Sequence, residues 1–442
     1  MEWTRQRAVL SATTLFVVLW SILVARGLWK AGVFQEDKSN DIHAYHAAAR
    51  SVWDWNVASS YESPHRSNLY PPTFAILLAP LGLLPYRLFA TLWVFLSAAI
   101  VLYIFRHMGR ILGIPLSLPA RIAGFLLAYR LIESDFANGN ANLFVLAVVM
   151  ASFDLLWTRG SFLAGGLFAI AILSKVSPVI GLAWVVFRLR WRFLAGVVVG
   201  GVLFGGLLPV AVLGREGAEK AWSAWQKVTL EHVHPSSGSY SKEEASGYEP
   251  GQSIRAFFHR ILRDSDATAH DGKKVSIHLF ALTKGSADVV YLLAAGGILI
   301  LALLLGWRRA PGLGIAFRPE EIATICALMV ALAPLSRKAH FLALWPAAVL
   351  GFDAFRSCDS HRRARVGAAL WSFAFVSVVA TSPDLIGRDL STRLLAYCPM
   401  SWAALALSAL LCAPGFFPQG GRKLNDPGKA ASCVGAVPQR SC

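Results

Sequence analysis

The chain has 442 residues, of which 55% are hydrophobic and only 15% charged, and its mean hydropathy is +0.52. Soluble domains carry a smaller apolar share, so this composition indicates a protein that crosses a membrane several times. The net charge of +16 does not indicate nucleic acid as a partner, because the Lys and Arg residues cluster between apolar runs, where they orient the chain in the bilayer.

Apolar runs recur from the N-terminus to residue 414. The first run is too long for the apolar core of a signal peptide and lacks a convincing cleavage site, so it predicts a retained transmembrane helix. The whole pattern predicts an all-α polytopic membrane protein with about twelve transmembrane helices, several of them short. The expected spans are residues 8–29, 86–105, 117–132, 141–157, 161–174, 177–187, 193–213, 288–306, 320–335, 340–355, 364–382 and 393–414.

The charges between these runs predict the orientation of the chain. Short connections such as residues 106–110, 188–192 and 355–365 are rich in Arg, and the positive-inside rule assigns them to the cytoplasm. Alternation then places two long loops, residues 30–85 and 214–287, on the extracytoplasmic face of the cell membrane. We expect one transmembrane domain over residues 1–414 and a disordered cytoplasmic tail over residues 415–442, which are rich in Gly, Pro and polar residues.

The first long loop predicts an amphipathic helix at the membrane surface, because its apolar residues recur at helical spacing from Ile42 to Val52. Trp53 and Trp55 follow, and indole rings favour the headgroup region. Asp41 opens this helix and has two interpretations that the pattern leaves open. It is either an N-cap that accepts hydrogen bonds from the first turn, or a group that acts in chemistry at the membrane surface.

Lys175 lies between two expected spans, and Pro178 interrupts the helix just after it. An ammonium group near a bilayer is costly without an anionic partner, so Lys175 is a candidate ligand for a lipid-linked phosphate; snorkelling to lipid headgroups is the alternative. His340, at the start of a later span, is either a donor to phosphate or an interfacial residue. Tyr70 could stack on a sugar or belong to the aromatic belt, and Asn140 could bind sugar hydroxyls or cap a helix.

Several well-known catalytic patterns are missing from the sequence. It contains no GxxxxGK[ST], no HExxH and no GxSxG, so nucleotide hydrolysis, zinc-peptidase and serine-hydrolase chemistry lack their usual motifs. The order of its own motifs instead resembles glycosyltransferase family 87. The stretches that carry the resemblance are "DIHAYHAAARSV", "LYPPTFAILLAPLGLLP", "GNANLF", "AGGLFAIAILSKVSPVIGL", "GQSIRAFFHRIL" and "APLSRKAHFLALWPA".

The resemblance implies a GT-C fold and a role for several residues. Asp41 matches the first-loop aspartate taken as catalytic base, Lys175 the lysine of a Lys-x-x-Pro stretch, and His340 a late histidine. Gln252 and Ser253 match the Asn-Gln-Ser turn of the long loop, although Gly251 replaces its Asn. Two further departures are Gly139-Asn140, where Gly-Gln is common, and Arg337, where Trp is frequent.

We therefore expect an integral-membrane enzyme that moves a hexose, mannose by the resemblance, from a polyprenyl phosphate donor to a glycolipid or glycan acceptor. Asp41 and His340 are the expected catalytic residues, Lys175 and Arg337 the donor-phosphate ligands, with no cofactor and no metal. Alternatives are a transporter or flippase of lipid-linked precursors and a non-catalytic assembly subunit. The remaining expected substrate contacts are Tyr45, Tyr70, Asn140, Gln252 and Ser253.

Overall fold

The computed structural model describes residues 2–34, 41–62, 69–158, 160–233, 251–264, 275–309, 317–413 and 416. The expected tail, residues 415–442, lies outside this part apart from residue 416. The described residues form helices and no strands, which agrees with the all-α prediction.

The first half of the chain comprises the helices α1 (Glu2–Lys30), α2 (Asp41–Trp53), α3 (Ser59–Glu62), α4 (Pro72–Gly82), α5 (Tyr86–Ile111), α6 (Leu118–Asn138), α7 (Asn142–Thr158), α8 (Ser161–Ser174), η1 (Ser177–Gly181), α9 (Leu182–Phe187), α10 (Trp191–Gly200), η2 (Gly201–Leu207) and α11 (Leu208–Val233). The second half comprises α13 (Ile254–Leu262), α14 (Lys284–Arg309), α15 (Pro319–Ala331), η3 (Lys338–Leu344), α16 (Trp345–Arg356), α17 (His361–Phe375), η4 (Val376–Ala380), α18 (Pro383–Ile386), α19 (Arg388–Leu395) and α20 (Pro399–Cys412).

Fewer helices qualify as membrane spans than the sequence predicts. Within the described residues, five helices are long and apolar enough to cross a bilayer, and the pair α19 and α20, bent by 57°, would make a sixth. The expectation of about twelve spans is therefore not confirmed beyond these. The five are Thr13–Lys30, Tyr86–Ile111, Trp191–Thr229, Lys284–Arg308 and His361–Ala380.

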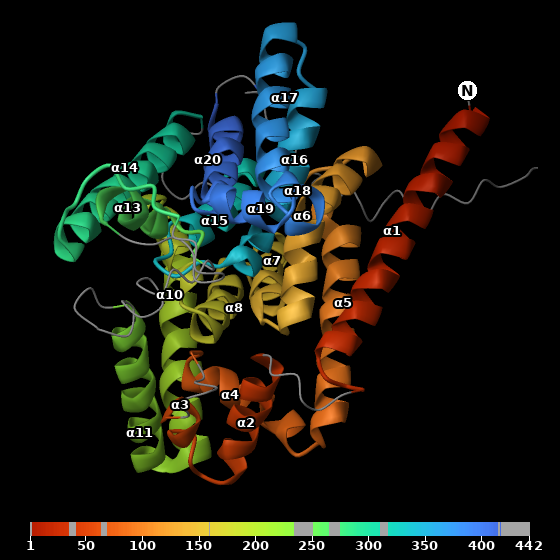
Figure 1. Cartoon of the computed structure of the whole chain (residues 1–442). Helices are drawn as coiled ribbons and strands as arrows, with labels where there is room; N and C mark the ends of the chain where they lie inside the picture. Colours follow the sequence, from red (N-terminus) through yellow and green to blue (C-terminus); the bar gives the residue numbers. More distant parts are fainter. Residues whose placement is uncertain are drawn as a thin grey trace, which may run out of the picture.

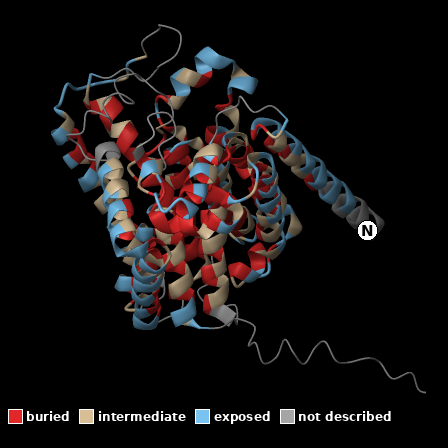
Figure 2. Ribbon diagram, turned by 90° about the horizontal axis from the view of Figure 1, so that it is seen from below, coloured by how far each residue is buried: buried red, intermediate tan, exposed pale blue. Residues whose placement is uncertain are grey.

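The remaining expected spans correspond to helices that are short or, in α6, charged. α15 has 13 residues and α16 has 12; nearly all residues of α15 and two thirds of those of α16 are buried against neighbouring helices. A helix surrounded by protein does not need an apolar run that matches the thickness of the bilayer. Figure 2 shows that buried residues gather at the centre of the bundle, with exposed residues around them.

Large apolar side chains cover much of the outer surface of the bundle. Soluble proteins rarely expose contiguous apolar patches of this kind, whereas a lipid-facing surface requires them. α1 stands at the edge of the bundle (Figure 2), with most of its spanning segment exposed. The exposed apolar residues include Leu15, Val18 and Ile22 of α1, Leu92, Phe95 and Leu96 of α5, and Leu292, Leu293 and Ile300 of α14.

α2, α3 and α4 lie together at one end of the molecule, where α1 ends and α5 begins (Figure 1). α2 packs closely on α4, because a Cβ on Gly82 would lie only 2.6 Å from the backbone of Ala49. The indole of Trp53 also donates a hydrogen bond to the Ala79 carbonyl at 2.6 Å. The helix expected in the first long loop is therefore present and begins at Asp41, and its position at the membrane surface stays a prediction.

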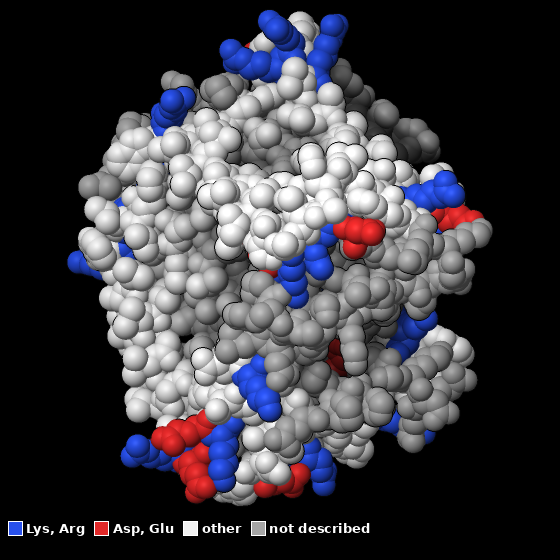
Figure 3. Space-filling model, turned by 60° about the vertical axis from the view of Figure 1, so that its left-hand side comes forward, with Lys and Arg blue, Asp and Glu red and all other residues white. Residues whose placement is uncertain are grey.

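α17 begins at the opposite end of the molecule (Figure 1), with the sequence HRRAR. Figure 3 shows Lys and Arg side chains over this end and a mixed cluster of charges near α11 at the other. The mixed cluster includes the exposed ion pairs Arg215–Glu219 and Lys220–Glu216. The positive-inside rule would assign the basic end to the cytoplasm, and the side of the membrane on which each end lies stays a prediction.

The chain reverses direction within α11. Gly214 has a φ of 71°, in the left-handed region that glycine adopts without strain. After it, the Trp222 indole donates to the Gly205 carbonyl at 3.0 Å, a contact that one continuous helix could not make across 17 residues. The Trp225 indole donates to the Leu69 carbonyl at 3.2 Å, so the returning segment packs beside the approach to α4.

Candidate functional site

Asp41 is the first residue of α2 and remains exposed to solvent. The next residue, Ile42, is fully buried and packs against Gly139, which ends α6 with a φ of 67°. A Cβ on Gly139 would lie only 2.3 Å from Ile42 Cγ1, so this close approach requires glycine. The turn after α6 therefore fixes the start of α2, and with it the position of the Asp41 carboxyl.

Lys175 lies where the helical path between α8 and α9 is broken. α8 ends at Ser174, Lys175 itself is extended, and η1 begins two residues later with Pro178 in its first turn. The Lys175 ammonium donates to Asn142 Oδ1 at 2.5 Å and lies 2.9 Å from His340 Nε2. Lys175 Nζ is also 5.5 Å from the centroid of the Tyr70 ring, a distance at which a cation and a π-system attract.

His340 and Arg337 come from the loop and 3-10 helix that follow α15. The backbone N–H of Arg337 donates to His340 Nδ1 at 3.2 Å, so the two residues hold each other in one turn. Arg337 is exposed and His340 is half-buried. The structure thus brings Lys175 and His340 together although 165 residues separate them in the chain.

Asp135 and Asn142 form a second group of polar side chains next to Lys175, in addition to His340. Asp135 is 1% exposed, and its Oδ1 accepts from Asn142 Nδ2 at 2.8 Å. Its Oδ2 accepts from the backbone N–H of Leu143 at 3.4 Å, at the start of α7. A continuous path of contacts therefore runs from Asp135 through Asn142 and Lys175 to His340.

The electrostatics of these groups depend on one another. Although Asp41 keeps exposed surface, the protein around its carboxyl raises its pKa by desolvation, and the nearby charges of Arg337 and Lys175 lower it. Burial lowers the pKa of Lys175 to about 8, while Asp135 and Asp41 raise it. Burial raises the pKa of Asp135 to about 8, and the Asn142 hydrogen bond and the Lys175 charge lower it. We call Asp41, Asp135, Asn142, Lys175, Arg337 and His340 the polar centre.

Tyr45 and Tyr70 pack against the polar centre on the side of α2 and α4. Both are buried, and the Tyr45 hydroxyl donates to the Tyr70 hydroxyl at 2.9 Å. The backbone N–H of Ala141 donates to the Tyr45 hydroxyl at 3.1 Å, which ties α2 to the turn that precedes Asn142. Asn140, the amide that we singled out from the sequence, is half-buried in the same turn.

Gln252 and Ser253 are 1% and 0% exposed, and the structure places both outside the polar centre. The backbone N–H of Gln252 donates to the Ser336 carbonyl at 2.7 Å, and the Ser253 hydroxyl donates to the Pro334 carbonyl at 3.1 Å. Ser253 Oγ also caps α13 by accepting from Ala256 N. Their contacts hold the loop that leads to Arg337, so they reach the site through the backbone.

Neither Asn142 nor Asp135 is among the site residues that we expected from the sequence. In the motif GNAN both amides fit a helix cap or a sugar contact, and nothing in the local pattern says which one meets Lys175. The position of Asn142 in the chain could have indicated its role. It is the first residue of α7, so its side chain lies at the end of a helix rather than in its apolar middle. A buried acidic residue seven positions earlier, Asp135, could have pointed to the same place.

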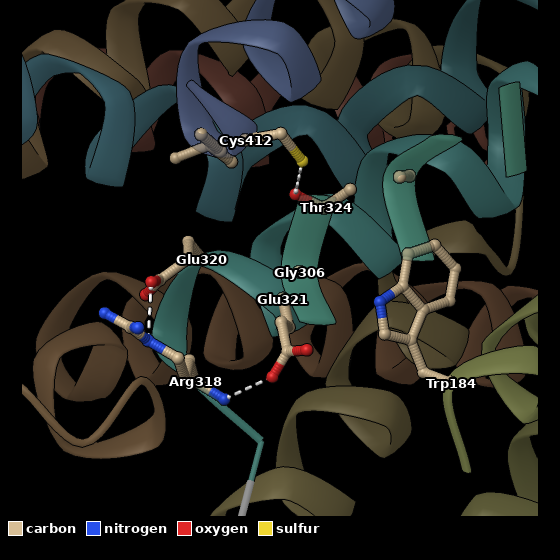
Figure 4. Close-up of a pocket in the computed structure, with 9 residues that line it drawn as sticks. Trp184, Gly306, Arg318, Glu320, Glu321, Thr324 and Cys412 are labelled. Carbon is tan, nitrogen blue, oxygen red and sulfur yellow. Dashed lines mark hydrogen bonds and ion pairs between the residues drawn. The ribbon is translucent and has the colours of Figure 1, made fainter. Parts of the chain in front are cut away.

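A separate pocket lies at the end of the bundle where α14 and α20 finish (Figure 4). Arg318 pairs with Glu320 at 2.7 Å, and its backbone N–H donates to Glu321 Oε2 at 2.9 Å. Thr324 and Cys412 close another side of it. The cavity volume is about 10 Å³, room for one water molecule at most, so the pocket does not accommodate a sugar or a lipid.

Comparison with known proteins identifies one family. The model of glycosyltransferase family 87 matches residues 68–334, more than half of the chain. No curated protein and no solved structure matches the chain. The matched range includes Tyr70, Asp135, Asn142 and Lys175, whereas Asp41 precedes it and the turn with Arg337 and His340 follows it.

Proposed function

The chain belongs to glycosyltransferase family 87, and on that premise we propose that it transfers a hexose, mannose being our first candidate, from a polyprenyl phosphate donor. The acceptor is a hydroxyl of a glycolipid or glycan on the extracytoplasmic side of the cell membrane. The observation that carries the proposal is the convergence of Asp41 with two cationic groups, Lys175 and Arg337, at the start of α2.

The position of the polar centre suits a lipid-linked donor. A polyprenyl phosphate sugar stays anchored in the bilayer, so its anomeric carbon is presented at membrane level. α2 starts with Asp41 at the end of the bundle where α1 ends, and the exposed indoles of Trp53 and Trp55 lie at and just after the other end of the same helix. Indole rings favour the headgroup region, which supports a position of α2 at the membrane surface, near the depth of the donor phosphate.

The proposed reaction is a direct displacement at the anomeric carbon. Asp41 accepts the proton of the acceptor hydroxyl as its oxygen forms the new glycosidic bond. The bond from the anomeric carbon to the donor phosphate breaks, and its electron pair leaves with the polyprenyl phosphate. One base and one displacement invert the configuration at the anomeric carbon.

Lys175 and Arg337 stabilise the leaving phosphate. A compact ammonium and a planar guanidinium both suit phosphate oxygens, and fixed positive charge lowers the barrier where negative charge develops. His340 lies against both cationic residues: its Nε2 is 2.9 Å from Lys175 Nζ, and its Nδ1 is 3.2 Å from the backbone nitrogen of Arg337. We assign it the alignment of the two cations against the phosphate.

The decisive experiment is a transfer assay with the purified protein in lipid nanodiscs. Polyprenyl phosphate mannose and polyprenyl phosphate glucose are offered in parallel with GDP-mannose and UDP-glucose, together with a membrane glycolipid extract. We expect release of polyprenyl phosphate with a lipid-linked donor and no turnover with either nucleotide sugar. Turnover with a nucleotide sugar alone would overturn the donor assignment.

The proposed side of the membrane is tested by thiol labelling in a background without native cysteines. A cysteine at Asn56, exposed between α2 and α3, should react with an impermeant reagent added to intact cells. A cysteine at His361, exposed at the start of α17, should react only after lysis. The reverse pattern would place the polar centre in the cytoplasm.

A further inference from the structure

Asp135 is a buried carboxylate for which the proposed reaction has no use. It lies on α6 with 1% of its surface exposed, and it does not contact the anchored donor or the acceptor in the proposed mechanism. Burial of a carboxylate is costly unless hydrogen bonds and nearby charge compensate it. Both of its oxygens accept N–H groups from the start of α7, and the nearest cation beyond them is Lys175.

The contacts of Asp135 extend to Lys175 through one side chain. Asn142 donates to Asp135 Oδ1 at 2.8 Å, which turns the other end of its amide, Oδ1, toward Lys175 Nζ at 2.5 Å. An amide held in this way presents only its acceptor to the ammonium. The carboxylate and the ammonium are thus separated by a single amide and interact through space without forming a direct ion pair.

We propose that Asp135 is a positioning residue that fixes Lys175 through Asn142 and preserves the positive charge with which Lys175 binds the donor phosphate. This inference rests on the proposed function, because it assumes that Lys175 binds phosphate. The proposal depends on the fact that Asp135 and Lys175 do not form a direct ion pair. A carboxylate in contact with Lys175 would compete with the donor, whereas one at the far end of an amide supports the charge and leaves the ammonium accessible.

The pH dependence follows from the groups around Lys175. Burial lowers the pKa of Lys175 to about 8, so the ammonium is lost as the pH rises through that value. Burial raises the pKa of Asp135 to about 8, so its carboxyl becomes charged over the same range and, once charged, favours the charged lysine. Removing the charge of Asp135 must therefore move the deprotonation of Lys175 to lower pH. The other groups that face Lys175 are Asp41 of α2, Tyr70 before α4, and Arg337 and His340 of the η3 turn.

The test is the binding of polyprenyl phosphate to the full-length protein in nanodiscs between pH 7 and pH 10. The second ionisation of a phosphate monoester has a pKa of about 6, so changes above pH 7 report the protein. For the wild type we expect affinity to fall as Lys175 loses its proton. For Asp135→Asn we expect the affinity at pH 7 to be close to that of the wild type or modestly lower. The loss of affinity at alkaline pH should begin about one pH unit lower than in the wild type.

Glu133→Gln is the matched control. Glu133 lies two residues earlier on the same helix, but it pairs with Arg26 at 3.0 Å and with Arg130 at 3.7 Å, and it does not contact Asn142 or Lys175. Its replacement should leave the alkaline fall in its wild-type position. An equal displacement in both variants would mean a general field effect and would overturn the specific role of Asp135.

Two further variants keep the inference falsifiable if Asp135→Asn folds poorly. Lys175→Arg should abolish the alkaline fall, because a guanidinium does not lose its proton below pH 12. Persistence of the fall in that variant would show that another group titrates, which overturns the proposal. Asp135→Asn in the Lys175→Arg background should then change nothing in the pH profile.

The outcomes separate the inference from the function on which it rests. Absence of polyprenyl phosphate binding by the wild type at every pH would overturn the proposed function and this inference together. Wild-type binding with an alkaline fall that Asp135→Asn leaves in place would overturn the role of Asp135 alone.

Discussion

Lys175 and Arg188 lie at the two ends of one short helical segment, η1 and α9, and their charged groups have different kinds of partner. Arg188 is 1% exposed and pairs with Glu321 at 2.7 Å. Its guanidinium also donates to the Gly306 carbonyl at 3.1 Å and lies over the Trp307 ring. The charge of Arg188 is fully engaged by the protein itself.

Lys175 is half-buried, and within the described chain no carboxylate lies at ion-pair distance from it. Its close partners are an amide and an imidazole, and both relevant carboxylates act on it from further away. A buried ion pair with complete hydrogen bonding joins helices, whereas a cation with neutral contacts retains attraction for an anionic ligand. From this comparison we infer that Arg188 stabilises the packing of the helices, whereas Lys175 is available to bind an anionic ligand.

The largest effect is expected from Asp41→Asn. Asn caps helices about as well as Asp, so α2 should form normally, but the amide cannot accept the proton of the acceptor hydroxyl. We expect turnover to fall by at least about a hundredfold while donor binding is retained, as is typical when a general base is removed. A transfer assay combined with polyprenyl phosphate binding measures both. Near-normal turnover would make Asp41 a cap and leave the base unassigned.

At the other end of the segment, Arg188→Ala should lower the stability of the fold and should not act directly on donor binding or turnover. It leaves Glu321 buried without its partner, and breaking a buried pair costs about 3–5 kcal/mol. We expect a clear drop in the melting temperature in detergent. Replacing both partners, Arg188→Met with Glu321→Leu, should restore most of that loss.

Retained stability in the Arg188→Ala variant, together with lost phosphate binding, would contradict the division between the two ends. The pocket beside Glu321 would then need a functional interpretation despite its small volume.

A smaller effect is expected from Lys175→Arg. A planar guanidinium keeps the charge but not the compact geometry that meets Asn142 and His340, so donor affinity should be only partly retained. Lys175→Ala should weaken binding further, with a melting temperature close to that of the wild type. Isothermal titration with polyprenyl phosphate and a thermal melt of the same samples measure the two quantities. An alanine variant that binds normally but melts early would make Lys175 an interfacial anchor.

Local patterns were sufficient to place Asp41 and Lys175. A helix that starts at Asp41 follows from the spacing of Ile42 and its apolar neighbours, and the break at Lys175 follows from Pro178. Both features depend on neighbouring residues only, which is why the sequence predicts them.

Long-range contacts were not predictable in the same way. The pairing of Arg188 with Glu321 joins residues 133 positions apart, and no local pattern distinguishes Asn142 from Asn140. The number of spans was overestimated for a related reason. Short apolar runs such as α15 read as lipid-facing helices, but their burial depends on neighbours that come from distant parts of the chain.

The packing of α6 has a consequence for the synthesis of the protein. Gly124 of α6 lies so close to α16 that a Cβ there would be 2.7 Å from the Val349 backbone nitrogen, yet α16 leaves the ribosome about 200 residues after α6. At about 5–20 residues per second, this interval is roughly 10–40 s. During that time the charges of α6 can pair only with segments that are made before α16. The Arg26–Glu133 pair at 3.0 Å, between α1 and α6, provides such an early partner, so α1 can shelter α6 in the nascent chain until the rest of the bundle arrives.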